Sequence, residues 1–358
     1  MSLEKKDLLK LMTLAATAEK NSPVAYSFGD EKFSATDLDE AVRVELGALA
    51  ADYATYRQNQ NLIFELVEKT IDEVLPKRVL EQYGQFAEVQ TVAQGDKAIY
   101  SQRISQASRM RAKQFVTKVG LAGVYEVFKL DGFKVEVETM AYGGAAQIGL
   151  EEFLDGRITF ADVLDIVLLA LDEAVYTEIA KALIAATNNL PAANKVSAGH
   201  FDEAAMDSLV AIADAYGQAT IYCTYEFATT MVPADGWISD GMKDTMWNVG
   251  YLANYKGHRV IVLPQSYTDD QHTTKVIDPS YAWIIPTGGN DKPVKIAFEG
   301  QTLVREAENH DWSKDIHVYK KIGVGTVLSN NLCRYVNTAL TTANYIDDAT
   351  NDGALPSV

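Results

Sequence analysis

The sequence predicts an α+β fold, and three observations predict it. The first 80 residues have the composition and spacing of helices, and segments from residue 85 onward alternate as strands do. Residues 159–189 carry a continuous apolar stripe at helical spacing. The chain has 358 residues, 47% of them hydrophobic, so it is long enough for two or three domains or for one large core with excursions.

The helical pattern of the N-terminal region is strongest over residues 34–75. Ser34 is a suitable N-cap because Asp37 follows three residues later, as in a capping box. A helix of roughly 40 residues is much longer than the average globular helix. We therefore expect either a break near Asn59–Asn61 or an extended arm, with an end at Pro76.

The strand-like region begins at residue 85, where β-branched and aromatic residues become frequent. The strand candidates are residues 86–94, 98–105, 123–130 and 133–142. Asp131–Gly132, between the last two, is a strong hairpin signal. The glycine-rich segment 142–149 that follows is interpreted as a hinge.

The helix predicted over residues 159–189 has Thr159 as a candidate cap and a stop signal at residues 188–191. Three acids along it exclude a membrane span. Ile166, Leu169 and Ala170 make its centre apolar on almost all sides, so we expect packing on both flanks, with a neighbouring subunit as one candidate partner. The residues predicted to pack along its stripe are Val163, Leu164, Val167, Leu168, Leu171 and Val175.

The remaining sequence alternates between helix and strand patterns. A hairpin is expected over residues 281–300, turning on Gly288–Gly289, and the tail after residue 340 lacks periodicity, as an arm or a disordered segment does. The other expected elements are a helix at 200–217, a strand at 219–232, a helix at 239–257 capped by Ser239 or Asp240, a strand at 258–264 and one or two strands at 315–337.

The chain is strongly acidic, with a formal net charge of −17. This balance argues against a surface that grips nucleic acid or anionic lipid, since both need Lys and Arg. One window departs from it: no acid occurs between Asp96 and Glu126, and residues 101–115 carry Arg103, Arg109, Arg111 and Lys113.

Three interpretations of this basic window are open: a solvated loop, a nucleic-acid finger, and an arm that docks onto an acidic neighbour. Interleaved aromatic residues, which would stack on bases, are missing from it. The docking arm is favoured, because other copies of the same chain offer an acidic partner.

No motif for catalysis, a cofactor or a metal is found. The five histidines share no metal-binding spacing, and the glycine-rich segments 142–149 and 323–330 do not match a phosphate loop. Asp269, Asp270 and His272 could hold a cation, but a solvated loop is the better account. Two cysteines are too few for a disulfide framework. We therefore predict no enzyme, no cofactor and no metal, with an α+β enzyme of unrecognised site as a remaining alternative.

The order of these elements resembles the major capsid protein family of tailed bacteriophages, which has the Hong Kong 97-type fold. The resemblance covers roughly residues 80–340 and rests on architecture: a long hairpin, a long helix, a second α/β region and a returning strand. The division that it implies is an N-terminal helical arm at 1–80, an extended-loop hairpin with flanking strands at 81–145, a peripheral domain with the spine helix at 146–218, an axial domain at 219–310, return strands of the peripheral domain at 311–340 and a C-terminal tail at 341–358.

The resemblance implies a structural protein that self-assembles, as pentamers and hexamers, into the icosahedral head shell enclosing double-stranded DNA of a tailed phage. The implied partners are many copies of the chain, a portal, and scaffolding or decoration proteins, with no sequence-specific DNA contact and no membrane. The implied location is the virion, after synthesis in the host cytoplasm. An encapsulin-type nanocompartment shell is the alternative within the same fold.

Overall fold

The computed structural model describes most of the chain. The described residues are 5–18, 25–29, 31–102, 133–148, 160–188, 190–232, 239–263, 265, 267, 271–272, 275–287, 292–308, 314–327 and 332–340. Helices and several sheets are both present among them, which confirms the predicted α+β class.

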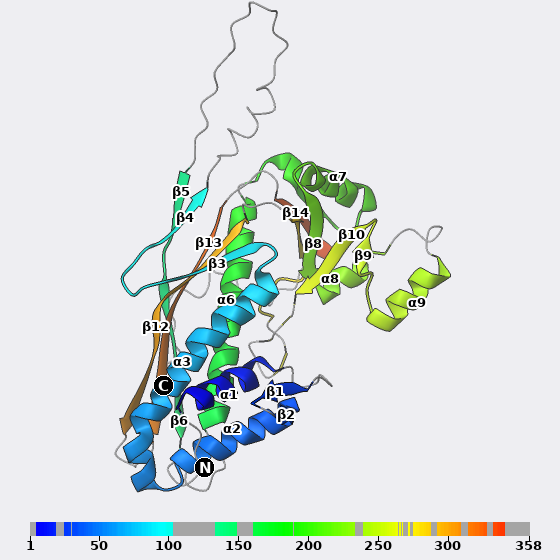
Figure 1. Ribbon diagram of the computed structural model, residues 1–358. Coiled ribbons are helices and arrows are strands. Elements are labelled where there is room, and N and C mark those ends of the chain that lie inside the picture. Colours follow the sequence, from blue (N-terminus) through cyan, green and yellow to red (C-terminus); the bar gives the residue numbers. More distant parts are fainter. Residues whose placement is uncertain are drawn as a thin grey trace, which may run out of the picture.

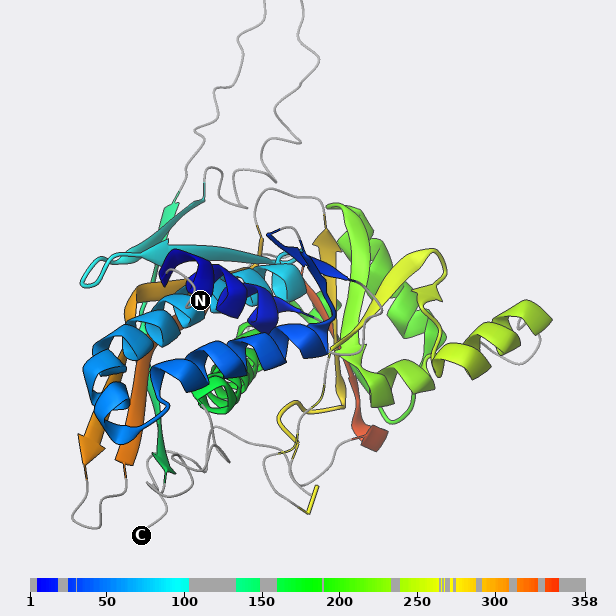
Figure 2. The ribbon, with the colours of Figure 1, turned by 60° about the horizontal axis from the view of Figure 1, so that its bottom comes forward.

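The N-terminal region forms a layer of helices on the body of the subunit (Figures 1 and 2). The predicted capping box is confirmed, because Ser34 and Asp37 exchange the expected side-chain to backbone hydrogen bonds. Buried side chains of all three helices belong to the same apolar core as Leu168 of the long central helix. The elements of this layer are α1 (Lys5–Thr17), the hairpin β1 (Tyr26–Phe28) and β2 (Glu31–Phe33), α2 (Ala35–Leu49) and α3 (Tyr53–Tyr83).

The expected positions of the break and the end in this region were both wrong. The chain breaks at residues 50–52, where Asp52 caps α3 by accepting a hydrogen bond from the Thr55 N–H at 2.7 Å. Asn59 lies inside α3, and its side-chain amide donates to the carbonyl of Leu49, the last residue of α2, at 3.1 Å. Pro76 also lies inside α3. Residues 74, 75 and 79 around it are buried, so tertiary packing compensates for the hydrogen bond that proline cannot make.

A four-stranded sheet lies against these helices and the central helix α6 (Phe160–Asn188). Its strand order is β3 (Ala87–Val92), β12 (Val294–Glu308), β13 (Lys314–Thr326) and β6 (Met140–Ile148). β12 pairs in parallel with β3, and β13 pairs antiparallel with both β12 and β6. Apolar side chains on its helix-facing side, such as Ile296, Phe298 and Val318, join the same core.

The glycine-rich segment interpreted as a hinge is instead part of strand β6. Gly143 is needed there for close approach, because a Cβ at this position would lie 3.0 Å from the carbonyl oxygen of Val318 in β13. Gly143 therefore allows tight pairing of β6 with β13.

A two-stranded antiparallel hairpin, β4 (Ala98–Gln102) with β5 (Phe133–Val137), rises from the end of the four-stranded sheet (Figure 1). These strands are the ends of the predicted hairpin excursion. The Asp131–Gly132 turn and the expected strand 123–130 lie outside the described residues.

The second sheet has six strands and mixed pairing. Its order is β7 (Lys195–Ala198), β14 (Cys333–Asn337), β11 (Tyr281–Thr287), β8 (Gln218–Thr224), β10 (His258–Leu263) and β9 (Asn254–Tyr255). One of its faces has its own core, with Ile221 and Phe227 fully buried. The other face, with Tyr222 and Trp283, joins the core that contains the four-stranded sheet. The short helices around it are α7 (Glu203–Asp214), α8 (Tyr225–Thr230) and α9 (Asp240–Val249), with 3₁₀ turns at Ala192–Asn194 and Thr338–Leu340.

Three expectations for this region were wrong. The helix expected over residues 239–257 ends at Val249, and Asn254–Tyr255 form strand β9. Residues 281–300 do not form a hairpin, because β11 belongs to the six-stranded sheet and β12 to the four-stranded sheet. The strand expected over residues 219–232 ends at Thr224, whose side chain caps helix α8. The division of the chain into named domains stays a prediction, and the sheets show only that the chain crosses between two layers several times.

Candidate assembly surfaces

The base of the extended hairpin is fixed to the body through Tyr100. Its hydroxyl donates to the carbonyl of Ile296 in β12 at 2.5 Å, and the ammonium of Lys295 lies 5.4 Å from the centre of its ring. Burial raises the pKa of Tyr100, so the hydroxyl keeps its proton and remains a donor. Lys97 and Glu136 form an ion pair across β4 and β5. The hairpin therefore leaves the sheet from a fixed base.

The basic residues predicted at the tip of this hairpin, Arg103, Arg109, Arg111 and Lys113, lie outside the described residues. Their role as a docking group stays a prediction.

The predicted apolar stripe of α6 faces the core. Leu164, Leu168, Leu171 and Val175 are buried, and Val167 is partly buried against the same cluster. The side chain of Val163 is outside the described part of the chain. These positions hold the helix between the N-terminal layer and the four-stranded sheet.

The opposite flank of α6 is open in the single subunit. Ile166 and Leu169 are 64% and 63% exposed, although they belong to the apolar centre of the helix. Beside them runs a groove between α6 and β6, with small residues on both walls, among them Gly144 and Ala174. Exposed apolar side chains along a groove are typical of a surface that another chain covers.

Acids of α6 secure it to the N-terminal helices. Arg43 of α2 donates to Asp162 at 2.8 Å, and Arg78 of α3 donates to Asp172 at 3.1 Å. Burial raises the pKa of Asp172, and the hydrogen bond from Arg78 acts in the opposite direction.

A buried ion pair joins α3 to the four-stranded sheet at a bulge in β12. Lys320 of β13 is almost fully buried, and its ammonium donates to Asp72 at 2.6 Å and to the carbonyl of Gly300 at 2.9 Å. Asp72 also accepts hydrogen bonds from the N–H and the hydroxyl of Thr302. One turn earlier on α3, Glu68 accepts from the N–H of Val304 at 2.8 Å. Two carboxylates of α3 thus bind strand N–H groups beyond the point where β3 stops pairing with β12.

Glu299, next to this bulge, gathers donors from three segments. Its carboxylate accepts hydrogen bonds from the Thr139 hydroxyl, from Lys321 at 2.9 Å and from the N–H of Gly95 at 2.9 Å. These hydrogen bonds lower the pKa of Glu299 to about 2, and the bond from Thr139 has the largest effect. The carboxylate is therefore ionised at neutral pH and ties β12 to the strands beside it.

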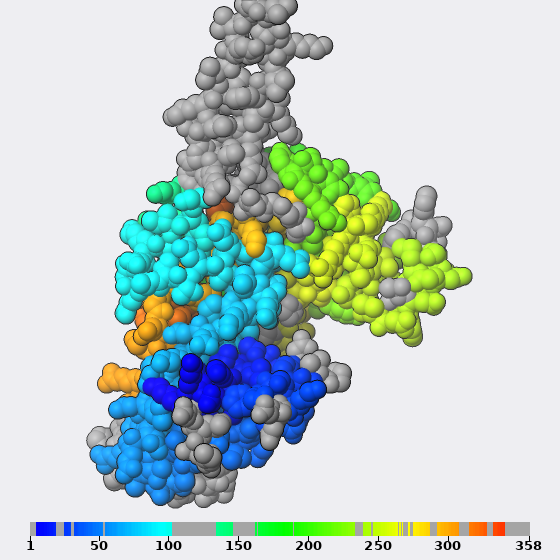
Figure 3. Space-filling model, viewed as in Figure 1, coloured from blue at the N-terminus to red at the C-terminus, as the bar shows by residue number. Residues whose placement is uncertain are grey.

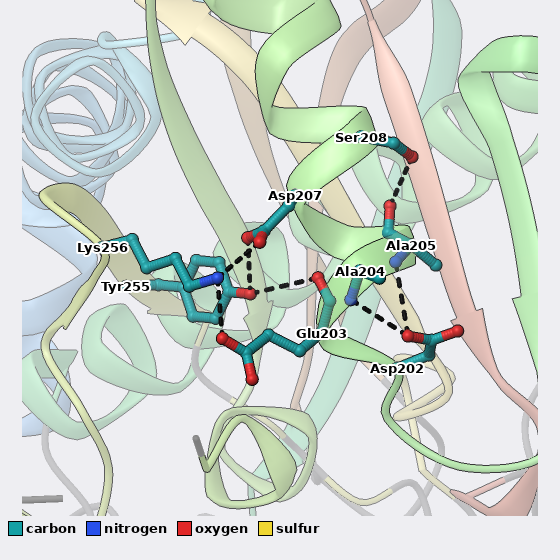
Figure 4. A network of polar contacts seen from close by, with 8 residues as sticks. All are labelled: Asp202, Glu203, Ala204, Ala205, Asp207, Ser208, Tyr255 and Lys256. Carbon is teal, nitrogen blue, oxygen red and sulfur yellow. Dashed lines mark hydrogen bonds and ion pairs between the residues drawn. The ribbon is translucent and has the colours of Figure 1, made fainter. Parts of the chain in front are cut away.

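A polar network connects α7 to the edge of the six-stranded sheet (Figure 4). Lys256, in the turn between β9 and β10, pairs with Glu203 at 2.7 Å and with Asp207. The Tyr255 hydroxyl donates to Asp207 at 2.9 Å. Burial raises the pKa of Tyr255, and the hydrogen bond to Asp207 raises it further. Lys256 and Gly257 both have positive φ, as in a tight two-residue hairpin turn. The network stabilises a turn that is unfavourable for lysine, so its role is structural.

The thiols and imidazoles have structural positions. Cys223 and Cys333 are buried free thiols, and burial raises the pKa of Cys333 to about 12. His258 opens strand β10, as predicted, and its Nε2 lies 3.4 Å from Asp214. Within the described ranges, no three His, Cys, Asp or Glu side chains gather where they could hold a metal ion. None of the described helices combines the length and apolarity that a membrane crossing needs.

One exposed surface, on α9, was not predicted from the sequence. Trp247 is 90% exposed on this short helix, which projects from the six-stranded sheet (Figures 1 and 3). The sequence does contain a signal for this exposure: the tryptophan lies between Asp244 and Asn248, on the polar side of an amphipathic helix pattern.

An α+β subunit with a projecting hairpin, an open apolar helix flank and a protruding helix defines a structural protein whose surfaces are completed by other chains. A family model described as "SPbeta prophage-derived putative capsid protein YonB" matches residues 11–333. The chain therefore belongs to this family of prophage capsid proteins. It is a structural capsid protein that assembles in many copies into the capsid shell, which confirms the resemblance found in the sequence.

Solved structures with a similar fold include shells of two kinds. The mature capsid of bacteriophage PhiM1 is 7% identical, with a TM-score of 0.48 over 71% of this chain and 86% of that one. The head of Helicobacter pylori bacteriophage KHP40 is 11% identical, with a TM-score of 0.47 over 72% and 91%. The SrpI encapsulin of Synechococcus elongatus PCC 7942 is 11% identical, with a TM-score of 0.45 over 73% and 87%. No curated protein matches the chain.

Proposed function

We propose that this capsid protein is the unit from which pentamers and hexamers form a closed icosahedral head around double-stranded DNA. The observation that carries the proposal is the capsid family model, which spans residues 11–333 and so includes the four-stranded sheet, all strands of the six-stranded sheet except β14, and the α-helices from α2 onward. Three surfaces of the subunit support the proposal: the hairpin β4–β5, the exposed apolar flank of α6 and helix α9. Each projects or is apolar, so each gains a partner when neighbouring subunits repeat the same contact.

The two sheets are proposed to serve different contacts. We propose a division by sheet that differs from the residue ranges predicted from the sequence. The four-stranded sheet with α3 and α6 would form the peripheral domain, so β12 moves out of the predicted axial range, and the six-stranded sheet with α7 to α9 would form the axial domain around the five-fold and six-fold axes. The hairpin β4–β5 is the base of the extended loop. This division is supported by the strand pairing, because the described strands of these two regions form two distinct sheets.

The extended loop is proposed to dock, through Arg103, Arg109, Arg111 and Lys113, onto an acidic neighbouring copy. The net charge of −17 supports this, since a basic segment on an acidic chain finds its complement on other copies. The same net negative charge supports a shell that encloses DNA without binding its phosphates tightly. A portal and scaffolding or decoration proteins complete the proposed partners, and the site of synthesis is the host cytoplasm.

The test is assembly of the purified chain. Sedimentation and negative-stain microscopy should find closed shells, or rings of five and six subunits, at moderate salt. A monodisperse monomer at high concentration would overturn the proposal. Particles isolated from producing cells should contain double-stranded DNA, whereas shells with a protein cargo and no nucleic acid would favour the encapsulin alternative.

A further inference from the structure

Trp247 is the most exposed large apolar side chain in the described part of the chain, at 90%. Single exposed apolar residues are common, but a tryptophan exposed to this degree is unusual because of its large apolar area. It lies on α9, which stands away from the six-stranded sheet in every view (Figures 1, 2 and 3).

Helix α9 has little support within its own subunit. It has ten residues, fewer than an isolated helix needs to be stable in water. Its ends are well formed: Ser239 accepts a hydrogen bond from the Met242 N–H at 3.3 Å, and Gly250 donates to the Met246 carbonyl at 2.7 Å. No other described helix or strand packs extensively against it. A short capped helix of this kind becomes stable when a partner covers it.

The direction of α9 is set at its C-terminal end. Gly250 has φ 87°, and a Cβ there would collide with the hydroxyl oxygen of Tyr225. Tyr225 in turn packs edge-to-face on Tyr251, with ring centroids 6.2 Å apart. The helix is thus aimed outward by a close backbone-to-aromatic contact that only glycine allows.

The charges beside Trp247 identify the class of partner. Asp240, Lys243 and Asp244 leave α9 with more acid than base, which disfavours anionic lipid and nucleic acid. Tryptophan is the residue type most enriched among the anchors of protein–protein interfaces. The partner is therefore a protein surface with an apolar pocket.

The position of α9 beside one edge of the six-stranded sheet indicates which protein Trp247 contacts. It directly precedes β9, the strand at one edge of the six-stranded sheet, whereas β7 forms the other edge. A contact from one side of a subunit to a different surface of the next is head-to-tail, and such contacts close into rings when they repeat. We propose that Trp247 inserts into an apolar pocket on a second copy of this chain within the same ring, and that α9 is an anchor between copies. This inference rests on the proposed function.

The experiment compares Trp247→Ala with wild type and with two controls. Trp247→Phe keeps an apolar ring, and Val44→Ala removes apolar atoms from another exposed position, 59% exposed on α2. Folding is checked by circular dichroism and melting of the unassembled chain, and assembly by sedimentation over a concentration series. Trp247→Ala should melt like wild type, but should need about 30-fold more protein to assemble, as expected for loss of an interface anchor. Trp247→Phe should lie between the two, and Val44→Ala should assemble normally.

A second readout uses fluorescence. The spectrum of Trp247 is the difference between wild type and Trp247→Phe, and it should shift to shorter wavelength on assembly as the indole leaves water. Unchanged assembly of Trp247→Ala, an equal defect in Val44→Ala, or the absence of the shift would each overturn the anchor. Failure of the wild type to assemble at all would instead overturn the proposed function.

Discussion

The buried ion pair between Asp72 and Lys320 gives the sharpest test of how the N-terminal layer is held. Replacing Asp72 by Ala leaves an almost fully buried ammonium without its carboxylate, and removes the acceptor of the Thr302 N–H and hydroxyl. At a separation of 2.6 Å and an effective dielectric constant of about 20, the gross attraction is about 6 kcal/mol. Desolvation offsets part of it, and the expected loss from breaking such a pair is about 3–5 kcal/mol.

The assay is urea unfolding of the unassembled subunit followed by circular dichroism. With a slope of about 3 kcal/mol per M, Asp72→Ala should lower the midpoint by roughly 1–2 M. Adding Lys320→Met to Asp72→Ala should recover much of this loss, because the buried charge is then gone. Lys10→Ala breaks only an exposed pair with Asp7 and serves as the control, with no measurable change expected.

Equal urea midpoints for Asp72→Ala and Lys10→Ala would refute this account of the ion pair. A double variant less stable than Asp72→Ala alone would also refute it, since the burial of an unpaired ammonium would then not be the cause of the loss.

Further predictions concern the central helix, the basic loop and pH. Leu168→Asp should prevent folding, because this side chain is 0% exposed, whereas Leu169→Asp, at a position 63% exposed, should fold with native circular dichroism and fail to assemble. The double variant Arg109→Glu, Arg111→Glu should keep the melting temperature of the subunit, but its assembly, followed by sedimentation, should be weaker and more sensitive to salt. If it assembles as well as wild type at every salt concentration, the basic segment is a solvated loop and not a docking arm. The pKa of Glu299 is lowered from 4.5 to about 2, so its stabilising effect is complete above about pH 4.5 and is lost as the pH falls through 2. Melting of wild type and Glu299→Gln should therefore differ at pH 7 and converge toward pH 2, and a constant difference would show that ionisation is not the cause.

The long helix could be predicted from sequence because its signal is local and repeated. Val167, Leu168 and Leu171 continue a stripe at three- and four-residue steps, and no other regular structure places such residues on one face. The Ser34 cap was also visible for a local reason, the acid three residues later. Pro76 was misleading, since its local cost is outweighed by buried neighbours that only the tertiary structure supplies.

The errors in the second half of the chain have a different physical cause. Residues 281–287 and 294–300 are both buried strands, and nothing local tells which sheet each one joins. Their partners are distant in sequence: Trp283 pairs with Tyr222, whereas Val294 pairs with Ala87. The open flank at Ile166 and Leu169 was suspected from composition. The exposure of Trp247 depends on how sparsely α9 packs against the other described elements, and a sequence does not show this.

The pairing of β12 with β3 also determines when the subunit can finish folding during its synthesis. Ala87 has to wait for Val294 to leave the ribosome, and β7 has to wait for β14, whose register joins Tyr335 to Val196. Contacts of such long sequence separation form late and slowly. The N-terminal helices are therefore made long before the sheet that buries them, and they present apolar faces to chaperones in the interval. A nascent or truncated chain lacks both finished sheets, so it cannot join a growing shell. Shell growth thus selects complete chains, because the surfaces that recognise a neighbour exist only after the last strands are in place.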